Sequence, residues 1–463
     1  MPPDVLVILC DTARADAFQP WNESAQTPIT GRLASQGLCF SQAIAPAPWT
    51  LPSTASIFSG RLPTEHGISG DGFRWEDGRP TSPTQGVRSL AGPWLPETFR
   101  ARGYRTWAAS ANGWVSRWGG FDRGFDEFID LREPVGTTKG PLASLGRAKR
   151  LAGIVDRGGR QAIRRFTAAA GRDGAPLFAF VNLMEVHTPY DPPRPFYPDR
   201  FWSRPASRRL SSGPESTRRF LRFNAGLDEP SEDFVARIRS LYLQSARYED
   251  WLLGGFVDAL QARGRPTVLA LVSDHGENLG EHGLFVHNSS LHQTLLHVPL
   301  VLWGWNVEVG PGRLDEPVSL LHLGDWLRSL ADGEPLSTSG QAVVSEYEST
   351  SRQRPIPPDL REQLVANGSG GPPPLFFHAG MAVQKGPLKY VATELGQESL
   401  FDLSTDPGEH RDLLEGRPSD ETGQFAPFAE AWRDRRRRQP SHEAGDVAEE
   451  EIAQQLRALG YID

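Results

Sequence analysis

Five short apolar runs divide the chain, and each run is continuous instead of alternating between apolar and polar positions. A strand that is covered on both faces shows this continuous pattern, because neither face meets water. The strand candidates span 5–10, 104–110, 177–184, 267–273 and 298–304, and the helix candidates between them span 90–102, 158–170, 231–262 and 318–331. The alternation of strand and helix predicts an α/β fold, with a doubly wound, mostly parallel sheet and helices on both faces.

The pattern changes after about residue 310. A Pro- and Gly-rich insert occupies 352–375, two short strand candidates occupy 380–393 and 399–404, and a charged helix candidate occupies 425–459. We interpret the insert as a surface loop, since such composition punctuates regular structure. The predicted organisation is a main α/β domain over 1–310 and a smaller C-terminal α+β subdomain over 311–463, with a small antiparallel sheet and a terminal helix.

Composition narrows the class of protein further. With 463 residues, 38% of them hydrophobic, the chain can bury a large core, and its formal net charge of −8 provides no general attraction to nucleic acid. Cys10 and Cys39 are too few for a disulfide framework, so we expect two buried free thiols in a reducing compartment. The chain start has neither the charge nor the apolar length of a signal peptide. We therefore expect a cytoplasmic protein with no transmembrane segment and no nucleic-acid partner, and the oligomeric state stays open.

Side chains that bind metals follow several of the predicted strands. Asp11, Asn112 and His187 each come after one apolar run, and Asp274 and His275 follow another. In a doubly wound sheet, ligands bind outside the carboxyl ends of the strands. Two carboxylates and an imidazole suit a hard or borderline divalent cation. We therefore predict a metal site at this edge of the sheet.

Thr50 lies in the segment "PWTLPSTASIFSGRLPTEHG", residues 48–67, where proline and small hydroxyl residues precede a helix-like run that ends at Gly60. One reading is that Thr50 caps a helix over 53–59. The other reading is that its hydroxyl completes the metal shell and acts as a nucleophile, because a bound cation lowers the pKa of a hydroxyl. Capping and catalysis are compatible.

Segments along nearly the whole chain resemble one enzyme family. Asp11 lies in "VLVILCDTARADAF", Thr50 in "APWTLPSTASIFSGRLPTEHG", and Asp274 and His275 in "VSDHGENLGEHG". The segments "EVHTPYDPP", "HNSSLHQTLLHVPL", "LFDLSTDPGEHRDLL" and "LRALGYID" follow the same scheme. Taken together they resemble the sulfatase branch of the alkaline phosphatase superfamily. The resemblance implies that the chain has the fold of this family and is a metal-dependent ester hydrolase.

The chain departs from the family pattern at the nucleophile. Formylglycine-dependent sulfatases carry Cys-x-Pro-x-Arg, whereas this register reads Thr50-Leu51-Pro52-Ser53-Thr54. Threonine cannot become the aldehyde, and an ester on threonine is released only by attack at the central atom, which phosphorus tolerates better than sulfur. The resemblance therefore implies the branch with a threonine nucleophile, which includes phosphodiesterases and phosphotransferases.

The resemblance also bears on the metal count. Relatives with two zinc ions need a further Asp-x-x-x-His, and the spacing from Asp406 to His410 we interpret as coincidence. We expect one divalent ion, either Mn, Ca, Mg or Zn. Its predicted ligands are Asp11, Thr50, Asp274 and His275.

Several residues in or near these segments are further candidates for the site. His187 or His287 is expected to protonate a leaving oxygen or to hold a nonbridging one. Further candidates are Asn112 as a donor to an equatorial ester oxygen, Arg14 as a contact to an anionic ester or only a partner of Asp16, Trp49 as a wall of the substrate site, and His282 as a support.

The function predicted from the sequence is cleavage of a phosphate mono- or diester, by hydrolysis or transfer, through a covalent threonine intermediate. The substrate is expected to be a small anionic ester. One alternative is a sulfuric ester hydrolase that uses the same threonine. The other is a catalytically inactive relative that binds an anion.

Overall fold

The computed structural model describes the greater part of the chain. The described residues are 2–68, 75–76, 79–80, 86–131, 156–172, 174–197, 204–211, 213–287, 290–338, 340–348, 378–414 and 420–438. The predicted insert at 352–375 lies outside them, as do residues 439–459 of the predicted terminal helix.

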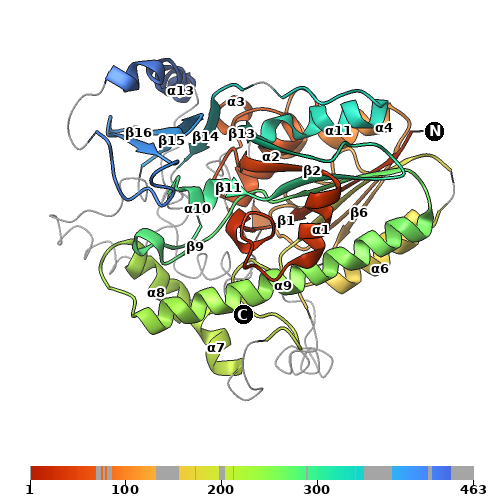
Figure 1. Cartoon of the computed structure of the whole chain (residues 1–463), viewed down its shortest axis with the longest axis horizontal. Helices are drawn as coiled ribbons and strands as arrows, with labels where there is room; N and C mark the ends of the chain where they lie inside the picture. The colour runs from red at the N-terminus through yellow and green to blue at the C-terminus, as the bar shows by residue number, and fades with distance from the viewer. Residues whose placement is uncertain are drawn as a thin grey trace.

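A large sheet forms the centre of the molecule (Figure 1), with the strand order β11-β2-β12-β8-β1-β7-β5-β6 and with β13 paired to β2. Its strands are β1 (Asp4–Cys10), β2 (Leu38–Ile44), β5 (Arg105–Ser110), β6 (Glu127–Asp130), β7 (Leu177–Leu183), β8 (Thr267–Val272), β11 (His297–Val298), β12 (Leu300–Trp305) and β13 (Gly312–Ser319). The strand β1 runs parallel to both of its neighbours, since Ile8 pairs with Val181 on one side and Leu271 on the other. Within this sheet, the described antiparallel pairs are those that β11 and β12 make with their neighbours. The predicted mostly parallel sheet is confirmed.

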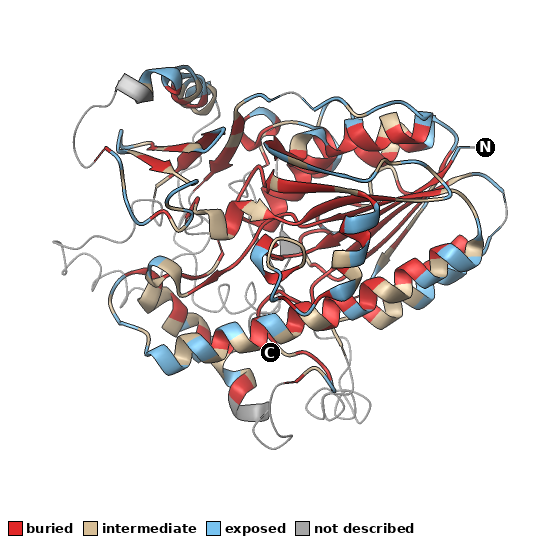
Figure 2. Cartoon of the chain, in the orientation of Figure 1, coloured by how far each residue is buried: buried red, intermediate tan, exposed pale blue. Residues whose placement is uncertain are grey.

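Helices cover both faces of this sheet (Figure 1). The helices α2 (Thr50–Ser59), α4 (Leu95–Ala101) and α11 (Leu323–Asp332) pack on one face, and α1 (Pro28–Gln36), α6 (Gly159–Ala170) and α9 (Glu232–Arg263) pack on the other. Side chains of β1 alternate between the two cores, with Val7 on the α2 side and Ile8 on the α9 side. Figure 2 shows buried residues along the central strands and the inner helix faces. Burial on both faces explains why the strands read as continuous apolar runs.

The structure corrects several predicted elements. The helix predicted at 90–102 begins only at Leu95, because Gly92 has a φ of +93° and Pro93 follows it. The helix predicted at 318–331 begins at Leu323. Residues Gly312–Ser319 form β13, and Leu320–His322 form a short 3-10 helix between the two. The strands β2, β6 and β13 were not predicted, since their polar positions interrupt the apolar pattern.

The C-terminal part contains a four-stranded antiparallel sheet in the order β14-β15-β16-β17. Its strands are β14 (Val343–Tyr347), β15 (Gly380–Lys385), β16 (Leu388–Thr393) and β17 (Glu398–Asp402), and α13 (Ala426–Arg438) follows them. Trp432 and Ala429 of α13 share a core with the sheet, and the ring of Phe425 stacks on Tyr390 at a centroid distance of 5.4 Å. The described elements thus agree with the small antiparallel sheet predicted for this part, whereas the boundary at residue 310 stays a prediction.

Short elements connect these units. They are β3 (Trp75–Glu76), β4 (Arg79–Pro80), β9 (Asn278–Leu279), β10 (Phe285–Val286), α3 (Pro63–His66), α7 (Arg204–Ser211), α8 (Pro214–Asn224) and α10 (Gln293–Leu296). Cys10 and Cys39 are buried free thiols, as predicted. Across the described part of the chain, each helix is either too short or too polar to cross a lipid bilayer.

Candidate active site and metal centre

Asp11 is the first residue after β1, and its side chain is completely buried. The backbone turns sharply here, because Thr12 has a φ of +64°. A β-branched residue rarely adopts this left-handed conformation, which costs on the order of 1–3 kcal/mol. The turn ends the strand and leaves the Asp11 carboxylate at the carboxyl edge of the sheet.

Asp274 and His275 follow the adjacent strand β8 and are also completely buried. The Nδ1 of His275 lies 2.9 Å from the backbone oxygen of Gly276. A carbonyl oxygen only accepts, so Nδ1 carries the proton and Nε2 presents its lone pair. That Nε2 atom lies 3.6 Å from Asp274 Oδ2 and 3.7 Å from Asp11 Oδ1.

Thr50 reaches this cluster from the start of α2. Its Oγ1 atom lies 3.2 Å from His275 Nε2 and 3.5 Å from Asp11 Oδ1, inside the buried site. The helix begins at Thr50 itself, and the extended residue Trp49 is the N-cap, so the reading of Thr50 as a cap for a helix over 53–59 is wrong. A hydroxyl in the first turn of a helix lies where the helix dipole favours negative charge.

The donor set fits a divalent cation. The ligand atoms of Asp11, Asp274 and His275 all lie within 4.8 Å of one another. Burial raises the pKa of Asp11 to about 7, and repulsion from Asp274 adds to it, while burial raises the pKa of Asp274 to about 7. Burial and the neighbouring His287 lower the pKa of His275 to about 4. Two desolvated acids beside a neutral imidazole are stabilised by a positive charge, and these oxygen and nitrogen donors suit such an ion.

Neighbouring side chains orient both carboxylates. The Nδ2 of Asn112 donates to Asp11 Oδ2 at 2.6 Å, and Asn182 lies 3.5 Å from the same oxygen. Thr54 lies 3.5 Å from Asp274 Oδ2, and Ser53 donates to the backbone oxygen of Asp274 at 2.5 Å. Asn112, predicted as a donor to the ester, thus holds a predicted metal ligand through a hydrogen bond.

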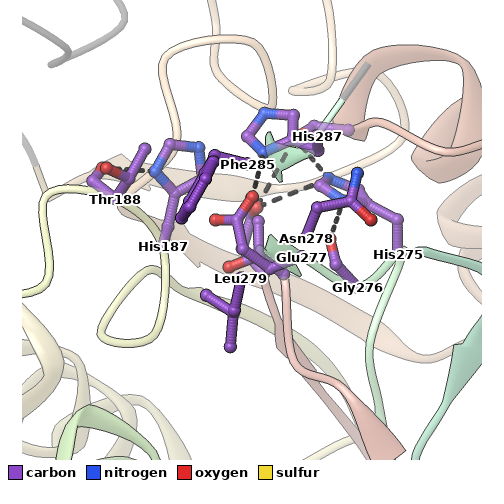
Figure 3. Close-up of polar contacts among 12 residues, drawn as sticks. His187, Thr188, His275, Gly276, Glu277, Asn278, Leu279, Phe285 and His287 are labelled. Atoms are coloured by element: carbon purple, nitrogen blue, oxygen red, sulfur yellow. Dashed lines mark hydrogen bonds and ion pairs between the residues drawn. The ribbon is translucent and has the colours of Figure 1, made fainter. Parts of the chain in front are cut away.

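Two further histidines, His187 and His287, lie near His275 (Figure 3). The ring centroid of His287 is 4.8 Å from that of His275 and 5.0 Å from that of His187. His287 Nδ1 lies 3.0 Å from Glu277 Oε1, and His187 Nδ1 lies 2.6 Å from the backbone oxygen of Thr188. Burial is the main cause that keeps the pKa of His187 well below its usual value. The structure thus brings together Asp11, Thr50, Asn112, His187, Asp274, His275 and His287.

Other candidates lie apart from this group or have different partners. Arg14 pairs with Asp16 at 2.6 Å and with Glu281 at 2.9 Å, which favours the reading of Arg14 as an ion-pair residue. Trp49 is buried and packs edge-on against Trp114, at a centroid distance of 5.9 Å.

The remaining polar candidates are His282 and the turn from Asp406 to His410, which lie close together. The Nε2 of His282 lies 2.9 Å from the backbone oxygen of Gly408, and its ring stacks on His292 at 3.9 Å. In the Asp406–His410 turn, Asp406 accepts a hydrogen bond from the backbone N–H of Arg411. His282 therefore contacts the C-terminal turn and makes no described contact with the metal ligands.

Sequence reasoning missed several residues of the site. Glu277 follows His275 by two positions, and Asn182 interrupts an apolar strand. Both could have been predicted from the sequence, because a polar residue in a buried segment needs a partner. Arg157 gave no signal. Its guanidinium donates to the backbone oxygens of Met184, His187 and Thr188, and so holds the loop that carries His187.

Comparisons with known proteins agree with this architecture. A family model described as Sulfatase matches residues 3–332 of the chain. A curated protein named Sulfatase, from Formosa agariphila, is 26% identical over 443 residues, covering 88% of this chain and 82% of that protein.

Solved structures share the fold. The phosphonate monoester hydrolase SpPMH from Silicibacter pomeroyi has a TM-score of 0.64 at 19% identity and covers 97% of this chain and 98% of that one. A protein solved in complex with its substrate D-glucosamine-2-N,6-O-disulfate has a TM-score of 0.63 at 13% identity, covering 96% and 100% of the two chains. At these identities, the likeness concerns the fold.

Proposed function

The chain belongs to the sulfatase family of hydrolases, and from that premise we propose that it cleaves a phosphate ester through a covalent intermediate on Thr50. One observation carries the proposal. The Thr50 hydroxyl lies 3.2 Å from His275 Nε2 and 3.5 Å from Asp11 Oδ1, and Thr50 is buried together with the two acids and the histidine. A hydroxyl with only a structural role has no need of such neighbours.

Asp11, Thr50, Asp274 and His275 would hold one divalent cation. Bound there, the cation supplies Lewis-acid chemistry, because it lowers the pKa of a coordinated hydroxyl and offsets negative charge on the ester. Mn, Ca, Mg and Zn all remain compatible with these donors.

The chain's own residues account for the proposed steps. Thr50 Oγ1 attacks phosphorus, its proton passes to Asp11 Oδ1, which lies 3.5 Å away, and the bond from phosphorus to the leaving oxygen breaks. The departing alcohol takes a proton from His187 or His287. A water, or an acceptor hydroxyl in a transferase, then attacks phosphorus and loses its proton to the same histidine. The bond between phosphorus and Thr50 breaks, and Thr50 Oγ1 takes back its proton from Asp11.

The identity of the nucleophile supports phosphate over sulfate. The segment Thr50 to Thr54 contains neither the cysteine that becomes an aldehyde nor the arginine of the family pattern. Without the aldehyde, the ester on Thr50 cannot be released by elimination. It must be displaced at the central atom, and phosphorus accepts a fifth oxygen more readily than sulfur does.

The similar proteins favour a second candidate, a sulfuric ester hydrolase that uses the same threonine. The relative from Formosa agariphila carries the name Sulfatase, and one structural neighbour was solved with a disulfated sugar. The phosphonate monoester hydrolase among the neighbours supports the first candidate. Both candidates place the covalent intermediate on Thr50.

Steady-state assays on para-nitrophenyl phosphate, its diester and para-nitrophenyl sulfate separate the candidates. We expect turnover of a phosphate ester, and Thr50→Ala to lower kcat/KM by at least about 10³-fold, as loss of a nucleophile does. Thr50→Ser is the matched control, because it keeps the hydroxyl. Peptide mapping after a quench with radiolabelled phosphate ester should find the label on Thr50. Turnover of sulfate alone would overturn the phosphate assignment, and full activity of Thr50→Ala would overturn the intermediate.

A further inference from the structure

The three histidines of the site differ in what faces their Nδ1 atoms. In His275 and His187 this atom faces a backbone oxygen, of Gly276 at 2.9 Å and of Thr188 at 2.6 Å. In His287 it faces the carboxylate of Glu277 at 3.0 Å (Figure 3). A carbonyl neighbour fixes the proton on Nδ1 and leaves a lone pair on Nε2. A carboxylate neighbour also accommodates a second proton on the ring, because it supplies the countercharge.

Glu277 is itself held from several sides. The residue is completely buried, and the Tyr190 hydroxyl and the Thr188 backbone N–H are close enough to stabilise the charged form of its carboxyl group. Its backbone oxygen accepts from Arg14 at 3.1 Å. Thr188 and Tyr190 belong to the loop that follows His187. Glu277 therefore links this loop to His287 and fixes the orientation of the His287 ring.

We infer that Glu277 is a positioning residue that holds His287 as the proton donor to the leaving oxygen, an inference that rests on the proposed function. With Glu277 in this role, His287 and not His187 is the histidine that protonates the leaving oxygen. His187 has a backbone oxygen at Nδ1, which supplies no countercharge for a second proton on the ring. In His287, the carboxylate at Nδ1 supplies the countercharge that a proton on Nε2 requires.

The proton count of the pair is balanced. Before the reaction Glu277 and His287 share two protons, one between the carboxyl group and Nδ1 and one on Nε2. As the bond between phosphorus and the leaving oxygen breaks, the Nε2 proton moves to that oxygen. The proton on Nδ1 then remains hydrogen-bonded to the Glu277 carboxylate. The nucleophile of the second step returns a proton to Nε2.

A leaving-group series tests this role. Alcohols that leave poorly as anions need the proton most. The activity lost when the proton donor is removed therefore depends on the leaving group. We expect His287→Ala to lower kcat/KM by about 10²-fold to 10⁴-fold for a phenyl ester and by less than about tenfold for a dinitrophenyl ester. Glu277→Leu should show the same dependence, and Glu277→Gln, which keeps an acceptor for Nδ1–H, should restore part of the activity.

His187→Asn is the matched control, because it removes the other imidazole. The fold-loss of kcat/KM in His187→Asn should be the same for every leaving group. The assignment is overturned if this loss depends on the leaving group while the loss in His287→Ala is uniform. The double variant Glu277→Leu/His287→Ala should be no worse than His287→Ala alone, since the two residues act as a unit. Additive losses would show that Glu277 acts independently of His287.

Failure of folding and failure of the proposed function are both distinguishable from failure of the inference. Retained turnover of the dinitrophenyl ester shows that a variant is folded. If the wild-type protein cleaves sulfate esters only, the phosphate assignment fails, and the same series run with aryl sulfates still tests Glu277. Uniform losses in Glu277→Leu across all leaving groups would reduce its role to a structural one.

Discussion

Two buried acidic sites in this protein have opposite electrostatics. In the candidate metal centre, burial raises the pKa of Asp11 to about 7, and repulsion from Asp274 adds to it. At the contact with the C-terminal sheet, burial alone would raise the pKa of Glu409, but the attraction of Lys389 and contacts with His292 outweigh it and lower the pKa to about 2. Lys389 Nζ lies 2.5 Å from Glu409 Oε1, and both side chains are buried.

The difference lies in the source of the countercharge. Glu409 has an internal cation in Lys389, so the pair is complete within the chain. Asp11 and Asp274 have only amides, hydroxyls and a neutral histidine as described polar partners. A buried charge needs a countercharge, and a divalent cation bound by these residues would supply it here. The comparison teaches that burial marks both sites, whereas the missing countercharge marks the functional one.

The largest expected effect concerns activity. Asp11→Asn removes one charge from the metal centre, so we expect the bound metal to be lost and kcat/KM to fall by about 10³-fold or more, since a cation contributes several kcal/mol to the transition state. Glu409→Gln is the matched control, because it removes a buried charge elsewhere, and it should keep both metal and turnover. Assays and elemental analysis of both variants provide the measurement. An active, metal-replete Asp11→Asn would break the comparison.

A second effect concerns stability. Lys389→Met leaves Glu409 buried without its cation, which should cost about 3–5 kcal/mol of unfolding free energy. In the presence of a chelator, Asp11→Asn should instead be as stable as the wild-type protein or more stable, because it relieves repulsion between two acids. Urea unfolding of the three proteins measures both changes. Equal destabilisation by the two variants would show that the sites do not differ in countercharge.

The smallest effect is a dependence on pH. The pKa of Glu409 is lowered from 4.5 to about 2 in the folded protein, so the unfolded chain binds the proton first as the pH falls. The stabilisation is complete above pH 4.5 and is lost as the pH falls to about 2. The difference in unfolding free energy between wild type and Glu409→Gln should shrink over this window. A constant difference across the window would mean that Glu409 is not ion-paired.

Much of the fold was accessible from the sequence because buried parallel strands leave a local trace. The run at 5–10 is apolar throughout, since β1 meets a core on each face. The strand β13, with its sequence GRLDEPVS, lies at the edge and leaves no such trace. Its identity depends on pairing with β2, a contact between distant segments.

The sequence by itself determined which side chains stand at the strand ends, and with them the predicted ligands Asp11, Asp274 and His275, because a strand end and a motif are local features. Only the tertiary structure decided that the helix begins at Thr50 itself. It also decided the partners of the polar side chains: Asn112 binds Asp11, Arg14 pairs with Asp16 and Glu281, and Glu277 faces His287. The physical reason is that hydrogen bonds and ion pairs depend on the direction of a side chain in space. That direction is settled when separate strands and loops pack together.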